Sequence, residues 1–268
     1  MRVLIIGRGY ISQKMQIALL KHEIQPMVYF EGHIDHYTPD FKFPPRLDLI
    51  INCAGYTGYP NVDDCEDHKN ETFAANTYLP AYLGRFCREN KITLIHFSTG
   101  CIFQGNQFFS ETDEPNNLNT IYTLSKYSGE KVINWSQSYI LRIRMPISAD
   151  FSPKNLLTKL SGYSKIIDGV NSITWLEEAC EIAVRLWLRE APFGIYNLVC
   201  RGFITNKEII EALGLKKEFF PTLKEFQSTV KAPRSFTTLS IEKLISIGIF
   251  PTSATNALQK VIYGRKAL

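Results

Sequence analysis

A tyrosine and a lysine four positions apart, Tyr122 and Lys126, are the residues of this chain best suited to chemistry. Residues at i and i+4 share one face of a helix, so the ammonium of Lys126 would lie beside the phenol of Tyr122. A neighbouring positive charge stabilises the phenolate and lowers a tyrosine pKa that is about 10 in water. Thr99 ends a strand-like run upstream, at the kind of position where α/β folds gather their ligands. Thr99, Tyr122 and Lys126 therefore form a triad suited to carbonyl reduction, with Tyr122 as the acid.

A glycine-containing turn near the N-terminus indicates a second site. The apolar run Val3–Ile6 is followed by Gly7–Ser12 and then by a helical pattern. Glycines let a backbone approach a pyrophosphate, and the start of the next helix attracts its negative charge. The third motif position is Ser12 instead of glycine, so the prediction depends on the place of the turn after the first strand. We expect dinucleotide contacts from Gly7, Arg8, Gly9, Tyr10 and Ile11.

Two charged residues favour different cofactors. Glu31 lies 24 positions after Gly7, where a carboxylate would bind the ribose hydroxyls of NAD and repel the extra phosphate of NADP. Arg8 could instead hold that phosphate through a charge-assisted contact. These residues leave both NADH and NADPH open. Further cofactor contacts are expected from Asn52, Ala54 and Gly55 after the third predicted strand, from Asn76, and from Tyr122 and Lys126.

The elements that must position these residues alternate between β-branched runs and helical stretches, which is typical of a parallel sheet covered by helices. We predict strands at Val3–Ile6, Met27–Phe30, Leu47–Asn52, Thr93–Ser98 and Tyr139–Ile143, and helices at Ile11–Lys21 and Tyr78–Glu89. The stretch Gly32–Arg46 holds three prolines and predicts a loop in place of a crossover helix. The fold class is therefore α/β, a Rossmann-type doubly wound parallel sheet.

The second half of the chain predicts a smaller companion domain. We expect residues 1–148 to form the NAD(P)-binding domain, 173–200 to return to its sheet, and 149–268 to form a substrate domain. The returning segment holds a helix at Trp175–Leu188 and a strand at Ile195–Val199. Helices of the smaller domain are expected at Asn155–Tyr163, Asn206–Leu213, Ile241–Ile247 and Thr255–Val261.

Composition excludes several classes of protein. With 30 basic and 26 acidic residues, the net charge of +4 gives no reason to expect a nucleic acid partner. No apolar run approaches the roughly 18 residues that span a bilayer, and no signal peptide precedes the first strand, so we expect a cytoplasmic protein without a membrane partner. Neither the six cysteines nor the five histidines form a metal-ligand pattern, and we predict no metal.

Longer blocks of sequence around the triad resemble a known family. The runs 53–63, 98–103 and 141–148, together with 155–159 and 232–235, are similar to the reductase half of plant rhamnose synthases, within the extended short-chain dehydrogenase/reductase superfamily. That family makes UDP-L-rhamnose from UDP-4-keto-6-deoxyglucose with NADPH, by 3,5-epimerisation followed by 4-reduction. The resemblance implies the same bifunctional enzyme here, supplied by a separate 4,6-dehydratase, and a homodimer by analogy with the superfamily.

The resemblance also assigns residues that spacing alone does not. Cys101 and Lys159 match the family's epimerisation pair, because a ketone at sugar carbon 4 acidifies the protons on carbons 3 and 5. Strand alternation would place Cys101 on the same side as Thr99, with its thiol tuned by Lys159 or by the rest of the site. Substrate contacts are expected from Thr99, Gly100, Asn155 and Arg234, with Arg234 on the diphosphate.

Two other functions remain open from the sequence. A dTDP-4-dehydrorhamnose reductase shares the triad but receives an already epimerised sugar, and Cys101 and Lys159 argue against it. A non-catalytic regulatory subunit, such as the reductase-like partner of methionine adenosyltransferase, would keep the fold as a scaffold. The complete triad argues against that alternative.

Overall fold

The apolar runs of the N-terminal half form a six-stranded parallel sheet in the order β11-β6-β4-β3-β1-β2. The computed structural model describes residues 1–29 and 42–267 of the chain, so Glu31 and most of the predicted loop lie outside the described residues. The strands are β1 (Val3–Ile6), β2 (Met27–Tyr29), β3 (Leu49–Asn52), β4 (Thr93–Thr99), β6 (Ser138–Ile143) and β11 (Gly194–Asn197).

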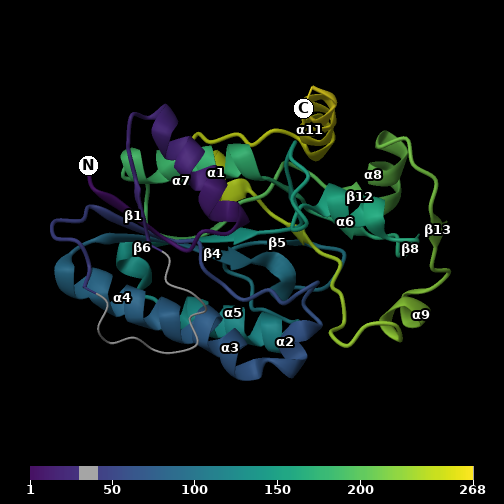
Figure 1. Cartoon of the computed structure of the whole chain (residues 1–268), viewed down its shortest axis with the longest axis horizontal. Coiled ribbons are helices and arrows are strands. Elements are labelled where there is room, and N and C mark those ends of the chain that lie inside the picture. The colour runs from purple at the N-terminus through teal and green to yellow at the C-terminus, as the bar shows by residue number, and fades with distance from the viewer. Residues whose placement is uncertain (30–41, 268) are drawn as a thin grey trace.

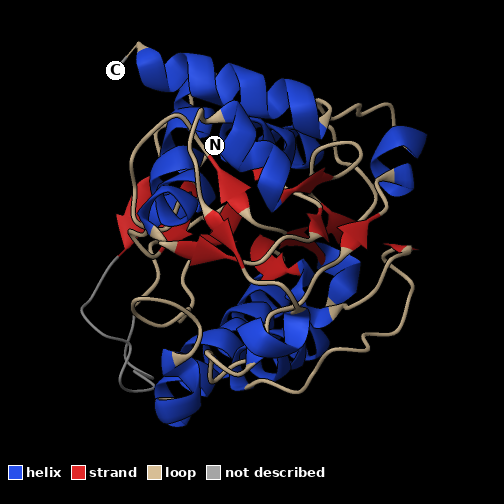
Figure 2. Cartoon of the chain, turned by 90° about the vertical axis from the view of Figure 1, so that its right-hand side faces the viewer, coloured by secondary structure: helices blue, strands red, loops and turns tan. Residues whose placement is uncertain are grey.

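Helices cover both faces of this sheet, as Figures 1 and 2 show. Val3 and Ile5 of β1 pack toward α1 (Tyr10–Lys21) and α7 (Leu176–Leu188). Leu4 and Ile6 pack on the opposite side, with α4 (Leu79–Asn90). Strands covered on both faces read as continuous apolar runs, which explains why the sequence pattern located them. The Rossmann-type α/β prediction is confirmed.

The strand order reverses between β1 and β3, because β2 lies beyond β1 while the later strands follow β3 on the other side. In open α/β sheets, ligands bind in the crevice outside the carboxyl ends of the strands at such a switch point. The glycine turn after β1 and the residues after β3 both open onto this crevice. The topology therefore places the two predicted cofactor segments side by side.

The lower helical layer in Figure 1 also carries two of the catalytic candidates, Tyr122 and Lys126. Besides α4 it comprises the short helices α2 (Asp64–Asp67) and α3 (Lys69–Phe73), the π-helical turn η1 (Ala74–Tyr78) and α5 (Ile121–Val132). The Tyr122–Lys126 pair lies on α5. The predicted helix at Tyr78–Glu89 is thus the last part of a longer helical run that begins before residue 70.

A second apolar core lies beside the sheet. It is formed by α6 (Leu156–Gly162), α8 (Asn206–Ala212) and α11 (Ala254–Lys266), with contributions from Ile147, Ile173 and Cys200. Short strands and turns complete the described elements: η2 (Gly100–Ile102), β5 (Phe108–Phe109), η3 (Trp135–Gln137), β7 (Pro146–Ile147), β8 (Lys165–Ile166), β9 (Val170–Asn171), β10 (Thr174–Trp175), β12 (Ile204–Thr205), β13 (Glu218–Phe219), α9 (Leu223–Gln227), β14 (Thr238–Leu239) and α10 (Glu242–Ser246).

One predicted helix belongs to a different core from the one expected. The helix expected at Ile241–Ile247 forms as α10, but Leu244 and Ile249 pack into the core of the large sheet. Chain position suggested the smaller domain because this segment lies between two of its helices. The apolar surface that the segment covers belongs instead to the β11 edge.

A buried ion pair fixes α5 against the sheet. Glu130 on α5 is fully buried and accepts hydrogen bonds from Arg142 of β6, at 2.7 Å from Nη2, and from the Ser98 hydroxyl of β4 at 2.5 Å. An unpaired charge at this depth would be costly, so the pair holds α5 in one position on the sheet. The position of α5 in turn sets the positions of Tyr122 and Lys126.

Glu130→Ala is expected to lower the free energy of unfolding by about 3–5 kcal/mol, because it leaves the Arg142 guanidinium buried without its carboxylate. Urea denaturation followed by circular dichroism measures the change. Glu89→Ala, at an exposed position of α4, is the control and should change stability by less than about 0.5 kcal/mol. A loss below about 1 kcal/mol for Glu130→Ala would show that the pair does not anchor α5.

Candidate active site

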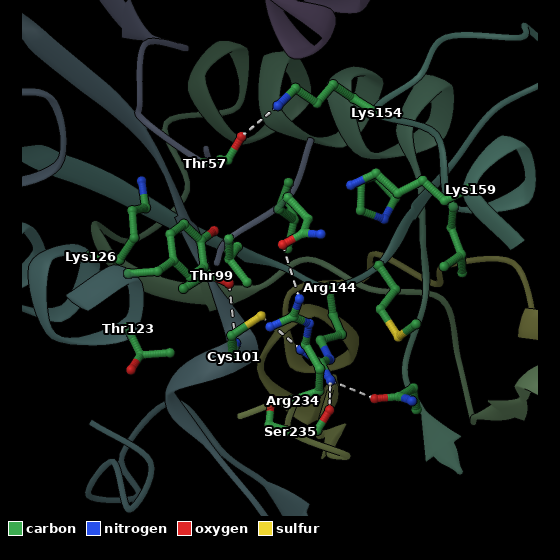
Figure 3. Close-up of a pocket in the computed structure, with 18 of the residues that line it drawn as sticks. Thr57, Thr99, Cys101, Thr123, Lys126, Arg144, Lys154, Lys159, Arg234 and Ser235 are labelled. Carbon is green, nitrogen blue, oxygen red and sulfur yellow. Dashed lines mark hydrogen bonds between the residues drawn. The ribbon is translucent and has the colours of Figure 1, made fainter. Parts of the chain in front are cut away.

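A cavity of about 470 Å³ lies between the carboxyl ends of the central strands and the second core. Its lining includes twelve of the residues predicted from the sequence: Gly9, Tyr10, Ile11, Ala54, Gly55, Asn76, Thr99, Cys101, Tyr122, Lys126, Lys159 and Arg234. In Figure 3, Thr99, Cys101 and Lys126 lie on one side of the pocket and Lys159 on the other. Both predicted sites, for reduction and for epimerisation, therefore share one cavity.

The glycine turn fits a dinucleotide. Gly7 has φ +97°, and a Cβ at this residue would lie 3.0 Å from the Ala54 nitrogen, so only glycine suits the position. A Cβ on Gly9 would enter open space. Within the described part of the chain, the start of α1 has no side-chain cap and no acidic residue in its first turn. Its free N–H groups and positive dipole end suit an anion such as a pyrophosphate.

Two further residues predicted to contact the cofactor, Arg8 and Gly55, differ in whether they line the cavity. Arg8 is exposed on the same turn and does not line the cavity. Gly55 does line it, and a Cβ there would come within 3.2 Å of Asn76 Oδ1. Because Gly55 has no side chain, the backbone after β3 can pack closely against Asn76 of η1.

Two predicted cofactor residues, Asn52 and Asn76, use their side chains within the protein. Asn52 is fully buried; its Oδ1 accepts from the Ala54 N–H at 3.1 Å, and its amide contacts His96 at 3.0 Å. Asn76 accepts from the Tyr56 N–H at 2.9 Å and donates to the Ser125 hydroxyl at 3.1 Å. Asn52 therefore shapes the loop behind the cavity, whereas Asn76 lines the cavity and ties that loop to α5.

The reduction triad is assembled, but its electrostatics differ from the expectation. Burial raises the pKa of Tyr122 well above its ordinary value, and the Cys101 sulfur raises it further, while the Thr99 hydroxyl lowers it. The Lys126 Nζ donates to the Phe97 carbonyl oxygen at 2.7 Å, and burial outweighs the groups that lower the pKa of Tyr122. Tyr122 is therefore held as the neutral phenol, the form that donates a proton.

Lys126 is itself perturbed. It is 5% exposed, and burial lowers its pKa to about 8, partly opposed by Glu130. A lysine in this state costs stability while it is charged, and it is available for hydrogen bonding to a ligand that enters the cavity. Lys126 lines the cavity, and its contact with the cofactor stays a prediction.

Lys126→Met is expected to stabilise the cofactor-free protein at pH 7 by about 1–3 kcal/mol. Because the pKa of Lys126 is about 8 in the folded chain and 10.5 ordinarily, the unfolded chain binds more protons in between. The free energy of unfolding of the wild-type protein therefore rises as pH increases from 8 to 10.5, because the buried lysine loses its charge. The advantage of Lys126→Met shrinks over the same interval. Urea titrations at several pH values measure this difference. Lys131→Met, at an exposed position of α5, controls for the loss of a lysine, and a pH-independent advantage of Lys126→Met would contradict the assignment.

Cys101 reaches the cavity by a different route from the one predicted. The strand ends at Thr99, whose hydroxyl accepts from the Cys101 N–H at 3.1 Å and starts the 3₁₀ turn η2. Strand alternation was therefore the wrong reason for the shared orientation of Thr99 and Cys101. The turn brings both to the cavity, whereas Gly100 does not line it and instead packs under Leu239.

Lys159 lines the cavity from α6, in the second core. Burial lowers its pKa below the ordinary value, and the positive charges of Lys154 and Arg234 lower it further. A lysine with a lowered pKa exchanges protons near neutral pH more readily than a solvated one. Its environment suits a proton-transfer role.

Arg144 is a cavity residue that the sequence reasoning did not assign to the site. Its Nη1 donates to the Cys101 sulfur at 2.7 Å, and its Nη2 donates to Asn171 Oδ1 at 2.6 Å. Nη2 also contacts the Ser235 carbonyl oxygen. In the sequence, Arg144 belongs to the run 141–148 that resembles the family, but nothing in the spacing connects residues 101 and 144.

The two polar residues predicted to bind substrate occupy distinct settings. Arg234 lines the cavity, where Nη1 donates to Asp63 at 2.7 Å and Nη2 donates to Asn61 at 3.0 Å. Asn155 is fully buried: it accepts from the Leu157 N–H at 3.1 Å, which caps α6, and donates to the Ser148 carbonyl oxygen at 2.7 Å. Arg234 remains available at the cavity wall, whereas Asn155 positions the helix that carries Lys159.

This arrangement and the sheet topology, together with homologues that are named reductases and epimerases, define the protein as an enzyme. Residues 1–265 match the model of the RmlD substrate binding domain family. The chain belongs to that family.

Relatives named for rhamnose chemistry support the family assignment. The chain is 36% identical over 213 residues to an Arabidopsis thaliana protein named bifunctional dTDP-4-dehydrorhamnose 3,5-epimerase/dTDP-4-dehydrorhamnose reductase, covering 73% of this chain and 69% of the relative. It is 35% identical over 231 residues, 80% of this chain, to an Arabidopsis thaliana trifunctional UDP-glucose 4,6-dehydratase/UDP-4-keto-6-deoxy-D-glucose 3,5-epimerase/UDP-4-keto-L-rhamnose-reductase. The match spans only 34% of that longer relative.

Solved structures show the same fold. The UDP-rhamnose synthase of Acanthamoeba polyphaga mimivirus superposes with a TM-score of 0.87 at 23% identity, covering 98% of this chain and 99% of the other. The dTDP-4-dehydrorhamnose reductase of Bacillus anthracis, solved in complex with NADP, gives a TM-score of 0.78 at 18% identity, with 98% and 97% covered.

Neither a membrane-spanning helix nor a metal-binding cluster is present among the described residues. No helix in residues 1–29 and 42–267 is both long and apolar enough to cross a membrane. In the same ranges, no three histidine, cysteine, aspartate or glutamate side chains gather in a way that could hold a metal ion.

Proposed function

We propose that this protein is a bifunctional 3,5-epimerase/4-reductase that converts UDP-4-keto-6-deoxyglucose to UDP-L-rhamnose with NADPH. The observation that carries the proposal is the presence of Cys101 and Lys159 in the same cavity as the Thr99, Tyr122 and Lys126 triad. A reductase that receives an epimerised sugar needs the triad alone. Two further proton-transfer groups beside it are explained by an epimerisation step.

Epimerisation needs a base and an acid on opposite faces of the sugar. In the proposed step, the Cys101 thiolate takes a proton from a carbon beside the ketone: the C–H bond breaks, an S–H bond forms, and the electron pair moves into an enolate. Lys159, which lines the cavity from the other core, then gives a proton to that carbon from the opposite face and is left neutral. Exchange with solvent restores both groups, and carbons 3 and 5 are inverted in turn.

Reduction follows at carbon 4. A bound reduced nicotinamide supplies the hydride for this step. Tyr122, held neutral by burial, gives its proton to the ketone oxygen as that oxygen becomes negatively charged, so the ketone becomes an alcohol and Tyr122 a phenolate. Thr99 orients the same oxygen. Lys126, beside Tyr122, binds the cofactor.

Binding follows from the two ends of the cavity. We propose that the glycine turn and the start of α1 hold the cofactor diphosphate, with Arg8 at the 2′-phosphate of NADPH. Arg234 would contact the diphosphate of the nucleotide sugar, since a planar guanidinium matches phosphate oxygens. Asp63 and Asn61 hold that guanidinium at the wall of the cavity.

The substrate and setting complete the proposal. A 4-keto-6-deoxy sugar is the product class of a 4,6-dehydratase, so such an enzyme must act first. We also propose residues 1–148, together with 173–200 and α10, as the cofactor domain and the rest of 149–268 as the substrate domain, a cytoplasmic location and a homodimer.

Turnover of UDP-4-keto-6-deoxyglucose by the chain alone, with NADPH and NADH in parallel, tests the function. UDP-L-rhamnose is the expected product, identified by NMR, with faster turnover of NADPH. Conversion of dTDP-4-keto-L-rhamnose without any turnover of the unepimerised sugar would identify a simple reductase. Binding of dinucleotide without oxidation by any 4-keto nucleotide sugar would indicate a non-catalytic subunit.

A further inference from the structure

The sulfur of Cys101 contacts a guanidinium that cannot easily turn away. Arg144 is 5% exposed, and its Nη1 lies 2.7 Å from the sulfur. Nη2 of the same guanidinium is held by Asn171 and by the Ser235 carbonyl oxygen. Two separate segments, at β9 and at residue 235, therefore fix the direction of the Arg144 N–H group that faces Cys101 (Figure 3).

The sulfur of Cys101 lies beside a buried guanidinium and further hydrogen-bond donors. Thiolates are the form of cysteine that removes protons, and an adjacent arginine stabilises them through a charge-assisted hydrogen bond. Two buried donors of the same cluster, Arg144 Nε and Asn171 Nδ2, have no acceptor among the described residues. Unused donors around one site leave it with an excess of positive potential, which an anionic sulfur would neutralise.

The other titratable groups that face Cys101 are Tyr122 from α5 and Lys159 from α6. Tyr122 is held neutral by burial, so it adds no opposing charge. Lys159 has a lowered pKa and gives up its proton more readily than an arginine, whose guanidinium stays charged at all working pH values. Arg144 is therefore the steadier source of positive charge for the sulfur, which favours the rest of the site over Lys159 among the two expected sources.

We infer that Arg144 is a positioning residue that keeps the Cys101 sulfur in its anionic, basic form and aims it into the cavity. The inference deepens the proposed epimerase function and rests on it for its catalytic meaning. It assigns Cys101 as the group that takes the proton from the sugar carbon, and it leaves Lys159 as the group that gives one back.

Alkylation of Cys101 by iodoacetamide tests the inference without any sugar. Thiolates react and thiols do not, so Arg144→Gln should slow alkylation of Cys101 at pH 7 by about tenfold or more, measured by mass spectrometry of its peptide. The deficit should close near pH 10, where hydroxide removes the proton without help. Arg144→Lys keeps a charge, so its rate of Cys101 alkylation should lie between those of the wild type and Arg144→Gln. It serves as the second variant if Arg144→Gln does not fold.

The controls separate charge from structure. Arg189→Gln, at an exposed position after α7, should alkylate Cys101 at the wild-type rate. Wild-type rates for both Arg144 variants at pH 7 would overturn the inference. So would a deficit that stays the same from pH 7 to pH 10, because a distorted site is slow at every pH.

A second measurement connects the inference to catalysis. Arg144→Gln should lower deuterium incorporation from D₂O into UDP-4-keto-6-deoxyglucose by at least tenfold at pH 7, while reduction of the already epimerised 4-keto-L-sugar falls much less. Absence of exchange in the wild-type protein would refute the proposed epimerase function. Equal alkylation of Cys101 in wild type and Arg144→Gln would refute the role of Arg144 whatever the exchange result.

Discussion

Tyr122→Phe is expected to lower the rate of 4-keto sugar reduction by about 10²–10⁴-fold, the range for loss of a positioned proton donor. The phenol lines the cavity beside Thr99, and burial keeps it protonated well above neutral pH. Phenylalanine keeps the ring and its packing but has no proton to give to the developing alkoxide. Deuterium exchange at carbons 3 and 5 should continue, because Cys101 and Lys159 are unchanged.

The measurement pairs NADPH oxidation, followed at 340 nm, with NMR detection of deuterium in the sugar. Tyr163→Phe is the matched control, since Tyr163 lines the far end of the same cavity and should affect reduction by only a few-fold. Parallel loss of reduction and exchange in Tyr122→Phe would mean that one group serves both steps. Retention of full reduction would remove Tyr122 from the mechanism.

Cys101→Ser is expected to give the opposite result, with deuterium exchange reduced by about 10²–10⁴-fold. A serine hydroxyl keeps nearly the same shape, but it is a far weaker acid than a thiol, so Arg144 cannot hold it as an anion. Reduction of a sugar that is already epimerised should remain within a few-fold of wild type. The hydride step depends on Tyr122 and Thr99, which this substitution leaves in place.

Cys53→Ala provides the comparison for Cys101→Ser. Cys53 also lines the cavity, but it lies at the end of β3, and burial raises the pKa of its thiol above the ordinary value. A buried neutral thiol has no part in proton exchange, so this variant should exchange deuterium as wild type does. Strong exchange in Cys101→Ser would assign the base to another residue.

Sequence patterns located the sheet because its strands are covered on both faces and read as unbroken apolar runs, such as β1 and β3. The glycine turn was also predictable, because its glycines directly follow the apolar run of β1. The structure adds the reason for glycine at residue 7: a side chain there would meet Ala54. Helix ends and the placement of α10 were less predictable, since they depend on which apolar surface lies opposite. That information is absent from a local pattern.

The sequence predicted which residues belong to the site better than it predicted the contacts between them. Tyr122 and Lys126 followed from helical spacing, and Cys101 and Lys159 from the family resemblance. The contact between Cys101 and Arg144 joins residues 43 positions apart on different elements, so no spacing rule reaches it. Likewise, the capping role of Asn155 appears only when Ser148 and Leu157 are seen around its amide.

Because the two apolar cores are separate, residues beside the second core can be substituted without changing the packing of the six-stranded sheet. The far end of the cavity is lined by Tyr163, Ile167 and Phe226, which follow or belong to short elements around the second core. None of these side chains contributes to the packing of the six-stranded sheet. Substitutions at these three positions should therefore change the shape of this part of the cavity while the six-stranded sheet keeps its packing.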